Sequence, residues 1–264
     1  MKFDITMEPS FLYNAWKLNT DTYIISHKAG AVYIYLLLGR QKALLIDTGY
    51  GTGNLRKFVE NLTGLPVDVV NTHGHFDHSG GDGWWNAVYA SPYAIPGMKS
   101  RPAGIEVDKQ PYPDFKVIPV TDKFTFDLGD RIVEVIEIPA HSEGSVALLD
   151  HGSKILFTGD EIEAGQVWLF SVDGRKKSIE KHLSNMLLLQ QRSSEFEILC
   201  PGHNGTPIAK EYIDDCVSLD EQIINGSQQN TNSLKSYVLE QFPFARQLKR
   251  AEYGVASVIY FPQQ

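Results

Sequence analysis

The stretch "NTHGHFDHSG", residues 71–80, places three histidines and one aspartate within six positions of a chain that has only eight histidines. His73 and His75 are two residues apart, so their side chains point to the same side of an extended chain. A turn after them would bring Asp77 and His78 to a second point close by. Histidine and aspartate at this spacing are typical metal ligands, so the stretch predicts a metal site.

Three further candidate ligands each end an apolar run that is typical of a strand. They are His141 in "IEIPAHSEGS", Asp160 in "ILFTGDEI" and His203 in "ILCPGHNG". Imidazole and carboxylate groups suit zinc, and they also suit iron or manganese. Seven ligands are too many for one tetrahedral ion, but they suit two divalent ions that share one carboxylate.

The ligands divide into two groups of three, with one aspartate shared between them. We expect His73, His75 and His141 on the first ion. We expect Asp77, His78 and His203 on the second ion, with Asp160 between the two. Two such ions lower the pKa of a water from about 15.7 towards 7, so a hydroxide bridged by both can attack a carbonyl group. Asp77 and Asp160 are the expected catalytic residues, because either could hold the water and carry a proton to the leaving group.

Two kinds of pattern indicate the elements that position these ligands. Apolar runs predict strands at 21–28, 31–38, 42–49, 66–73, 115–120, 131–139, 145–151, 153–160, 196–203 and 253–261. Helical spacing of apolar residues predicts helices at 52–62 and 177–192, and the segment 210–247 looks mostly helical. Strands in two batches with helices between them indicate two sheets that carry helices on their outer faces. We expect a single domain over 1–264, in which the segment 210–247 caps the site or forms an outer helix layer or an oligomer contact.

Composition limits the partners of the protein. The formal charge is -8, and an acidic surface disfavours nucleic acid. The chain begins "MKFDITMEPS", without the apolar core of a signal peptide, and its longest apolar run is too short to span a bilayer. We therefore expect a cytoplasmic protein that acts on a small molecule, with no membrane partner and with a homodimer left open. The two cysteines, Cys200 and Cys216, are predicted to be buried apolar residues.

Other residues of chemical interest have plainer interpretations. The three histidines outside the predicted site read as polar surface or capping residues: His27, His151 and His182. Four aromatic residues follow the ligands and could form an apolar wall for the substrate, or pack as ordinary core: Trp84, Trp85, Trp168 and Phe170.

With His141, Asp160 and His203, the pattern H-x-H-x-D-H at 73–78 resembles the metallo-β-lactamase superfamily. The stretch "LLIDTG" at 44–49 is similar to an early strand and turn of that family, and the resemblance extends over roughly residues 20 to 210. It implies an α+β fold, a four-layer αβ/βα sandwich of two mixed β-sheets with helices on the outer faces and a dinuclear site along their top.

By the same resemblance, Asp47 orients a metal-binding histidine; the alternative is a turn aspartate. The chain resembles the glyoxalase II and lactonase-like members rather than a β-lactamase proper, because one major β-lactamase class has cysteine where Asp160 stands. It departs from the acyl-homoserine lactonases at Glu163, where they have tyrosine.

The predicted function is that of a dinuclear metal-dependent hydrolase that cleaves an ester, a thioester, a lactone or a similar carbonyl substrate. Two alternatives stay open at this point. One is a mononuclear iron dioxygenase that acts on a thiol or persulfide, and the other is a metal-binding sensor without turnover.

Overall fold

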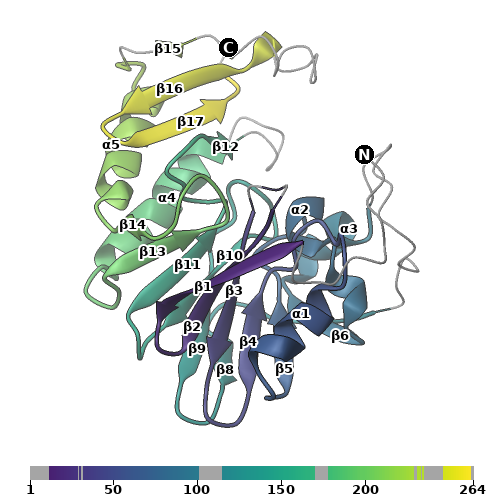
Figure 1. Cartoon of the computed structure of the whole chain (residues 1–264). Coiled ribbons are helices and arrows are strands. Elements are labelled where there is room, and N and C mark those ends of the chain that lie inside the picture. The colour runs from purple at the N-terminus through teal and green to yellow at the C-terminus, as the bar shows by residue number, and fades with distance from the viewer. Residues whose placement is uncertain are drawn as a thin grey trace.

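Two β-sheets pack face to face, and helices cover their outer faces (Figure 1). A computed structural model describes residues 12–28, 30, 32–100, 115–169, 178–228, 231–232, 234 and 246–262. This arrangement confirms the predicted four-layer α+β sandwich.

The first sheet has seven strands in chain order. They are β1 (Tyr13–Asn19), β2 (Thr22–His27), β3 (Tyr33–Leu38), β4 (Ala43–Ile46), β5 (Val67–Val70), β6 (Ala87–Ala90) and β7 (Lys116–Pro119). Strands β1 to β4 pair antiparallel, and β4 to β7 pair parallel. Parallel neighbours need a crossover, and α1 (Leu55–Leu62) supplies the one between β4 and β5. The side chain of Asn54 caps α1 by accepting the main-chain N–H of Lys57.

The second sheet has six strands in the order β14-β13-β11-β10-β9-β8. Their bounds are β8 (Thr125–Asp127), β9 (Ile132–Glu137), β10 (Val146–Asp150), β11 (Ile155–Gly159), β13 (Ile198–Pro201) and β14 (Ile208–Ala209). Strands β11 and β13 are parallel, and α4 (Ser178–Gln191) lies between them in the chain. Helix α5 (Tyr212–Ile224) follows β14 and packs against α4.

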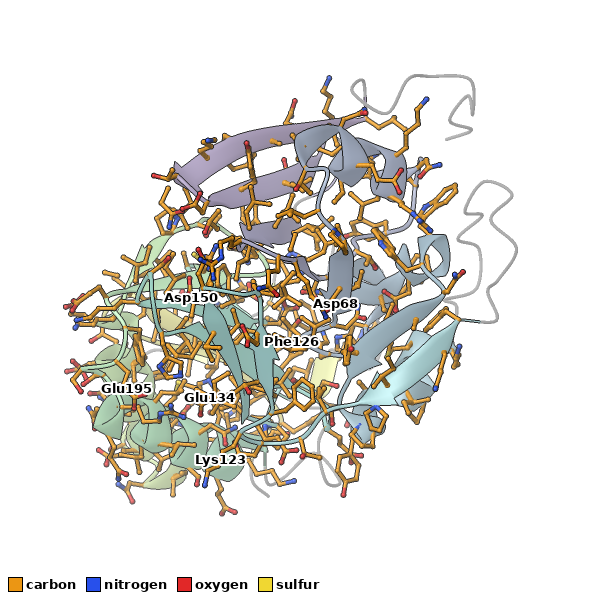
Figure 2. The ribbon with its side chains drawn as sticks, turned by 90° about the horizontal axis from the view of Figure 1, so that it is seen from below. Asp68, Lys123, Phe126, Glu134, Asp150 and Glu195 are labelled. Carbon is orange, nitrogen blue, oxygen red and sulfur yellow. The ribbon has the colours of Figure 1, made fainter. Side chains whose placement is uncertain are left out.

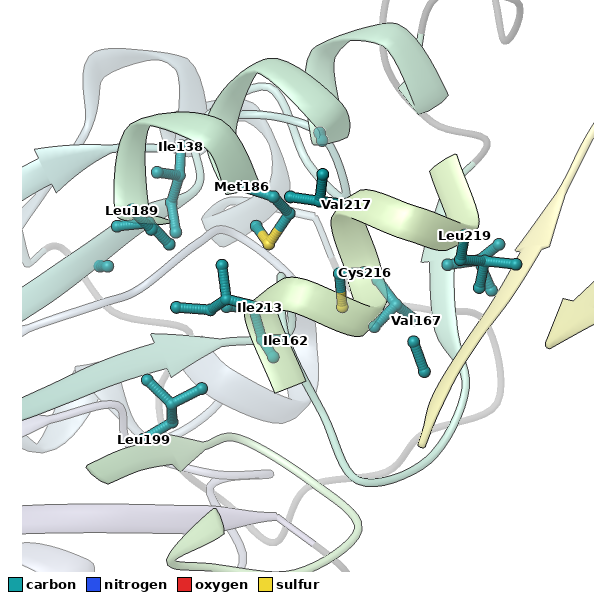
Figure 3. Packing of buried hydrophobic residues seen from close by; sticks show 14 of the residues in the cluster. Ile138, Ile162, Val167, Met186, Leu189, Leu199, Ile213, Cys216, Val217 and Leu219 are labelled. Atoms are coloured by element: carbon teal, nitrogen blue, oxygen red, sulfur yellow. The ribbon is translucent and has the colours of Figure 1, made fainter. Parts of the chain in front are cut away.

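Three apolar layers hold the sandwich together. Between the sheets, Leu44 and Val70 of the first sheet share a buried cluster with Val135 and Phe157 of the second. A second cluster joins α1 to the outer face of the first sheet. The third joins α4 and α5 to the outer face of the second sheet (Figure 3). Both cysteines are buried and free, as predicted.

A third, four-stranded sheet was not predicted. Its order is β12-β17-β16-β15, with β12 (Val167–Leu169), β15 (Thr231–Asn232), β16 (Lys249–Tyr253) and β17 (Ala256–Tyr260). The single strand predicted at 253–261 is wrong at its start, because Gly254 has a φ of 54° and turns the chain between β16 and β17. The segment 210–247 was predicted to be mostly helical; its described residues contain the α-helix Tyr212–Ile224, and 229–230, 233 and 235–245 lie outside the described residues.

Several short elements were also missed. Strands β1, β6, β8, β12, β14, β15 and β16 were not predicted. Neither were the short helices α2 (Phe76–Ser79) and α3 (Ile95–Met98) or the two 3₁₀ turns at Asp82–Trp84 and Pro92–Ala94. Among the residues that the structure describes, no helix has the length and hydropathy needed to cross a membrane.

A buried ion pair ties the two sheets together at the end away from the predicted ligands. Both Nε and Nη2 of Arg131 donate to Oδ2 of Asp150, at 3.0 and 2.6 Å. The same guanidinium donates to the carbonyls of Asp21 and Leu38 and to the hydroxyl of Thr22, which lie at one end of β2 and β3. Figure 2 looks at this end of the molecule from below and labels Asp150.

Candidate metal centre

The predicted ligands all follow strands that end at the same edge of the sandwich. His73 and His75 follow β5, and Asp77 and His78 lie in the single turn of α2. His141 follows β9, Asp160 directly follows β11, and His203 follows β13. Because β11 and β13 are parallel, their carboxyl ends bring Asp160 and His203 side by side. In Figure 1, α2 lies near the upper end of the sheets.

The structure brings all seven side chains together in the two groups that the sequence predicted. One ligand atom from each member of the first group lies within 4.8 Å of the others, and so do the ligand atoms of the second group. The first group is His73, His75, His141 and Asp160, and the second is Asp77, His78 and His203.

Asp160 faces both groups. Its Oδ2 lies 3.8 Å from Nε2 of His73 and 3.6 Å from Nε2 of His141. The same carboxylate reaches the second group, with Oδ1 at 3.2 Å from Nε2 of His78 and Oδ2 at 3.4 Å from Nε2 of His203. Oδ1 is buried and has no hydrogen-bond partner in the described part of the chain. A carboxylate in this position can bridge two cations.

Hydrogen bonds on the far side of three rings decide which nitrogen faces the site. Nδ1 of His141 lies 2.9 Å from the carbonyl oxygen of Trp168, which only accepts, so this nitrogen carries the hydrogen. Nδ1 of His78 donates in the same way to Oδ2 of Asp47, at 2.8 Å. Nδ1 of His73 lies 3.1 Å from Oγ1 of Thr72, whose own hydrogen is given to Asp47. In each ring Nε2 is therefore left for the site.

Asp47 thus orients His78 directly, and it reaches His73 through Thr72; both histidines belong to the predicted ligand set. It accepts from the main-chain N–H of Thr72 at 2.7 Å, from the hydroxyl of Thr72 and from His78, and it is buried. Its φ of 64° lies in the left-handed region, which aspartate tolerates better than most residues. The turn conformation and the orienting role therefore belong to the same residue.

The histidine nitrogens that face the site cannot all be satisfied by hydrogen bonds to one another. Nε2 of His73 and Nε2 of His141 lie 3.0 and 2.9 Å from the same atom, Nδ1 of His75. That atom carries at most one hydrogen, so at least one lone pair has no donor there. A divalent cation supplies what the arrangement lacks, and the donor set of imidazole and carboxylate suits it. The residues present therefore fit divalent metal ions.

Electrostatics in the metal-free site differ between the two groups. Burial, reinforced by His141, lowers the pKa of His75 to about 4, so His75 is neutral at pH 7 as a ligand must be. Burial opposes protonation of His203, but Asp160 and Asp77 outweigh it and raise its pKa to about 10. Burial also acts against ionisation of Asp77, but His78 and His203 lower its pKa to about 2. In the metal-free second group, the proton on His203 therefore occupies the position where a metal ion would bind.

Sequence reasoning missed several residues around the ligands. Glu161 accepts from the main-chain N–H groups of Ala140 and His141, and its only signal in the sequence is that it follows Asp160. Asn204 donates from Nδ2 to Glu163, which is buried, and burial together with Asp160 raises the pKa of Glu163 to about 8. Burial and the charge of Asp160 therefore favour the neutral form of Glu163 beside the site.

Of the remaining histidines, the surface interpretation is wrong for two. His182 is completely buried, and His27 is buried against Tyr13. His151 is exposed, with its side chain 41% accessible, as predicted. It lies with Glu134 and Glu195 at the lower end of the molecule, where Figure 2 labels both glutamates. Both carboxylates pair with Arg192, so a cation is already present in that cluster.

The four aromatic residues that follow the candidate ligands lie in different surroundings. Trp85 is buried in the core of the first sheet, and Trp84 packs against the same core. Trp168 packs beside Leu248 and Ile259 of the C-terminal part of the chain. Phe170 lies outside the described residues. The core interpretation therefore holds for the adjacent tryptophans.

With this geometry in place, comparison with known proteins gives a family. Residues 27–203 match the family model of the Metallo-beta-lactamase superfamily, and the chain belongs to that superfamily. It is 32% identical over 171 residues to a Gallus gallus protein named Acyl-coenzyme A thioesterase MBLAC2, over 52% of this chain and 60% of the relative. It is 30% identical over 135 residues to a Synechococcus hydroxyacylglutathione hydrolase, over 50% of each chain.

The solved structures agree on the fold. A metallo-beta-lactamase from Pontibacter korlensis superposes with a TM-score of 0.60 at 22% identity, over 79% of this chain and 99% of that one. This chain spans about three fifths of the length of the thioesterase relative and half of the hydrolase relative. The superfamily and the His and Asp clusters together support the use of divalent metal.

Proposed function

We propose that the protein is a hydrolase that holds two divalent metal ions, zinc ahead of iron or manganese, and cleaves a carbonyl substrate. The observation that carries this proposal is the position of Asp160 between two complete groups of ligand atoms. Ions bound here would lower the pKa of a shared water to near 7 and polarise the substrate carbonyl, so that the water attacks as hydroxide. No serine or cysteine nucleophile is then needed.

Asp77 and Asp160 take different parts in the proposed reaction. The side chain of Asp160 is 8% exposed and faces both groups, so it orients the attacking water. The side chain of Asp77 is 27% exposed, so it is the carboxylate that lies open to substrate and solvent. Asp77 is therefore the group placed to take a proton and pass it towards the leaving group.

Among esters, thioesters and lactones, we place thioesters first. A thiol has a pKa of about 8.5 and leaves as a thiolate more easily than an alcohol leaves as an alkoxide. The family relatives named acyl-coenzyme A thioesterases support the same choice.

A panel of paired substrates tests the proposal. Zinc-loaded protein would be assayed with a thioester and an oxygen ester of the same acyl chain, and with lactones. We expect the thioester to be cleaved fastest, His75→Ala to lose turnover, and His151→Ala, a histidine variant outside the site, to keep it. No turnover of any member would contradict the hydrolase and favour a sensor. Oxygen uptake with a thiol or persulfide by iron-loaded protein would favour the dioxygenase.

A further inference from the structure

A buried histidine–aspartate pair lies behind the metal centre, and the proposed reaction does not use it. His182 of α4 and Asp220 of α5 are both completely inaccessible to solvent. Nδ1 of His182 lies 2.6 Å from Oδ2 of Asp220. Figure 3 shows Met186 of α4 and Val217 of α5, which share the apolar layer into which this pair is set. Burying two such groups is costly unless each is paired, so the pair calls for a reason beyond packing.

The other nitrogen of His182 leads towards the ligands. Nε2 lies 2.8 Å from the main-chain carbonyl oxygen of Glu161, which only accepts, so Nε2 carries a hydrogen and donates it. Asp220 fixes the orientation of the ring from the opposite side. The imidazole is therefore held between the outer helix layer and the turn that follows β11.

Glu161 joins two ligand-bearing turns. Its main chain continues directly from Asp160. Its side-chain Oε1 accepts the main-chain N–H of His141 at 2.8 Å and that of Ala140 at 3.0 Å. A shift of Glu161 would therefore move Asp160 through the main chain and His141 through the side chain.

We propose that His182 and Asp220 are positioning residues that, through Glu161, fix the places of Asp160 and His141 in the metal centre. The inference rests on the proposed metal site. Groups that orient metal ligands change affinity by about 10- to 100-fold when they are removed, although they do not touch the ion. A pair that only fills the contact between α4 and α5 would change stability and leave metal affinity alone.

Two substitutions of the same residue separate these roles. The amide nitrogen of asparagine stands close to the place of Nδ1 of histidine, and that of glutamine close to the place of Nε2. His182→Asn therefore keeps a donor to Asp220 and loses the one to Glu161, whereas His182→Gln keeps the donor to Glu161. Each variant loses one buried hydrogen bond, and His182→Gln loses the one to the buried carboxylate of Asp220, so the larger cost to stability falls on the variant that should keep its zinc affinity.

The measurement is zinc affinity by competition with a chelator, together with the absorption spectrum of the cobalt(II)-substituted protein and thermal unfolding of the metal-free form. We expect His182→Asn to bind zinc roughly tenfold more weakly and to change the cobalt spectrum, while His182→Gln stays within about threefold of the wild type. Equal affinities and equal spectra for both variants and the wild type would overturn the inference.

Two further results keep the test decisive. If His182→Asn does not fold, Asp220→Ala replaces it, because the imidazole then loses its fixed orientation; zinc affinity unchanged in Asp220→Ala would overturn the inference. If the wild-type protein itself binds no zinc or cobalt, the proposed metal site has failed, and the inference falls with it. Binding by the wild type with no difference among variants refutes the positioning role alone.

Discussion

Substituting Asp47 by asparagine should weaken the binding of the ion in the second group far more than that of the ion in the first. Oδ2 of Asp47 accepts the Nδ1 hydrogen of His78 at 2.8 Å and leaves Nε2 of that ring for the second group. The amide oxygen of asparagine would take over the main-chain N–H of Thr72, which Oδ1 of Asp47 accepts at 2.7 Å. Its NH₂ group would then face His78 and donate to Nδ1, so the ring hydrogen would move to Nε2 and block the ligand position.

The magnitude follows from the bond that is lost. A buried hydrogen bond to a charged group contributes roughly 1.5–3 kcal/mol, which corresponds to about 10- to 100-fold in affinity. Asparagine tolerates the left-handed conformation of this residue, whose φ is 64°, so backbone strain adds little. His73 is affected less, because Thr72 stands between it and Asp47.

Zinc titration against a chelator measures the effect, with Asp82→Asn as the matched control. Asp82 is a buried aspartate of the same region that accepts from Thr48 and Asn71. Burial raises its pKa to about 8, which favours the neutral form, so asparagine is a close replacement in both shape and charge. We expect Asp47→Asn to lose the ion of the second group and Asp82→Asn to keep both ions. Unchanged binding of both ions by Asp47→Asn would refute the reasoning about the tautomer.

Three further predictions follow from other parts of the fold. Arg131→Ala leaves Asp150 buried without its partner and should cost about 3–5 kcal/mol of unfolding free energy, measured by urea denaturation; a loss below about 1 kcal/mol would contradict the pairing. Gly202→Ala would place a methyl group 2.5 Å from Oδ1 of Asp160, so the variant should fold but lose metal, as elemental analysis would show; full metal content would count against this geometry. Burial opposes protonation of His182, but Asp220 outweighs it and raises the pKa of His182 to about 9. The contribution of the His182–Asp220 pair to the unfolding free energy is therefore complete below pH 6.5 and is lost as the pH rises to 9. Denaturation of the metal-free protein at both pH values should show this loss, and His182→Gln should show a smaller one, because His203 still contributes.

The sequence was enough to predict which side chains come together and how they group, because each candidate ligand follows an apolar run. Strands that end at one edge of a sheet bring such residues together whatever the details of the turns. His203 could be assigned with His78 in this way although 125 residues separate them. The four-layer arrangement followed from the alternation of strand and helix patterns, together with the resemblance to the superfamily.

The sequence could not show the surroundings of the ligands. His182 lies in a helix whose apolar face is poorly marked by its sequence, and its partner Asp220 lies 38 residues away on another helix. Nothing local shows that both are buried. The third sheet was missed because β12 and β15 are only three and two residues long, and pairing with β17 and β16 rather than local propensity determines them.

The number of divalent ions bound per chain tests the central claim most directly. Protein purified without chelator or added metal would be analysed for its elements and then titrated with zinc. The geometry predicts two ions per chain at saturation, and one fewer in a variant that lacks His203. Saturation at one ion in the wild type would contradict the dinuclear site, and no uptake at all would contradict the metal centre itself.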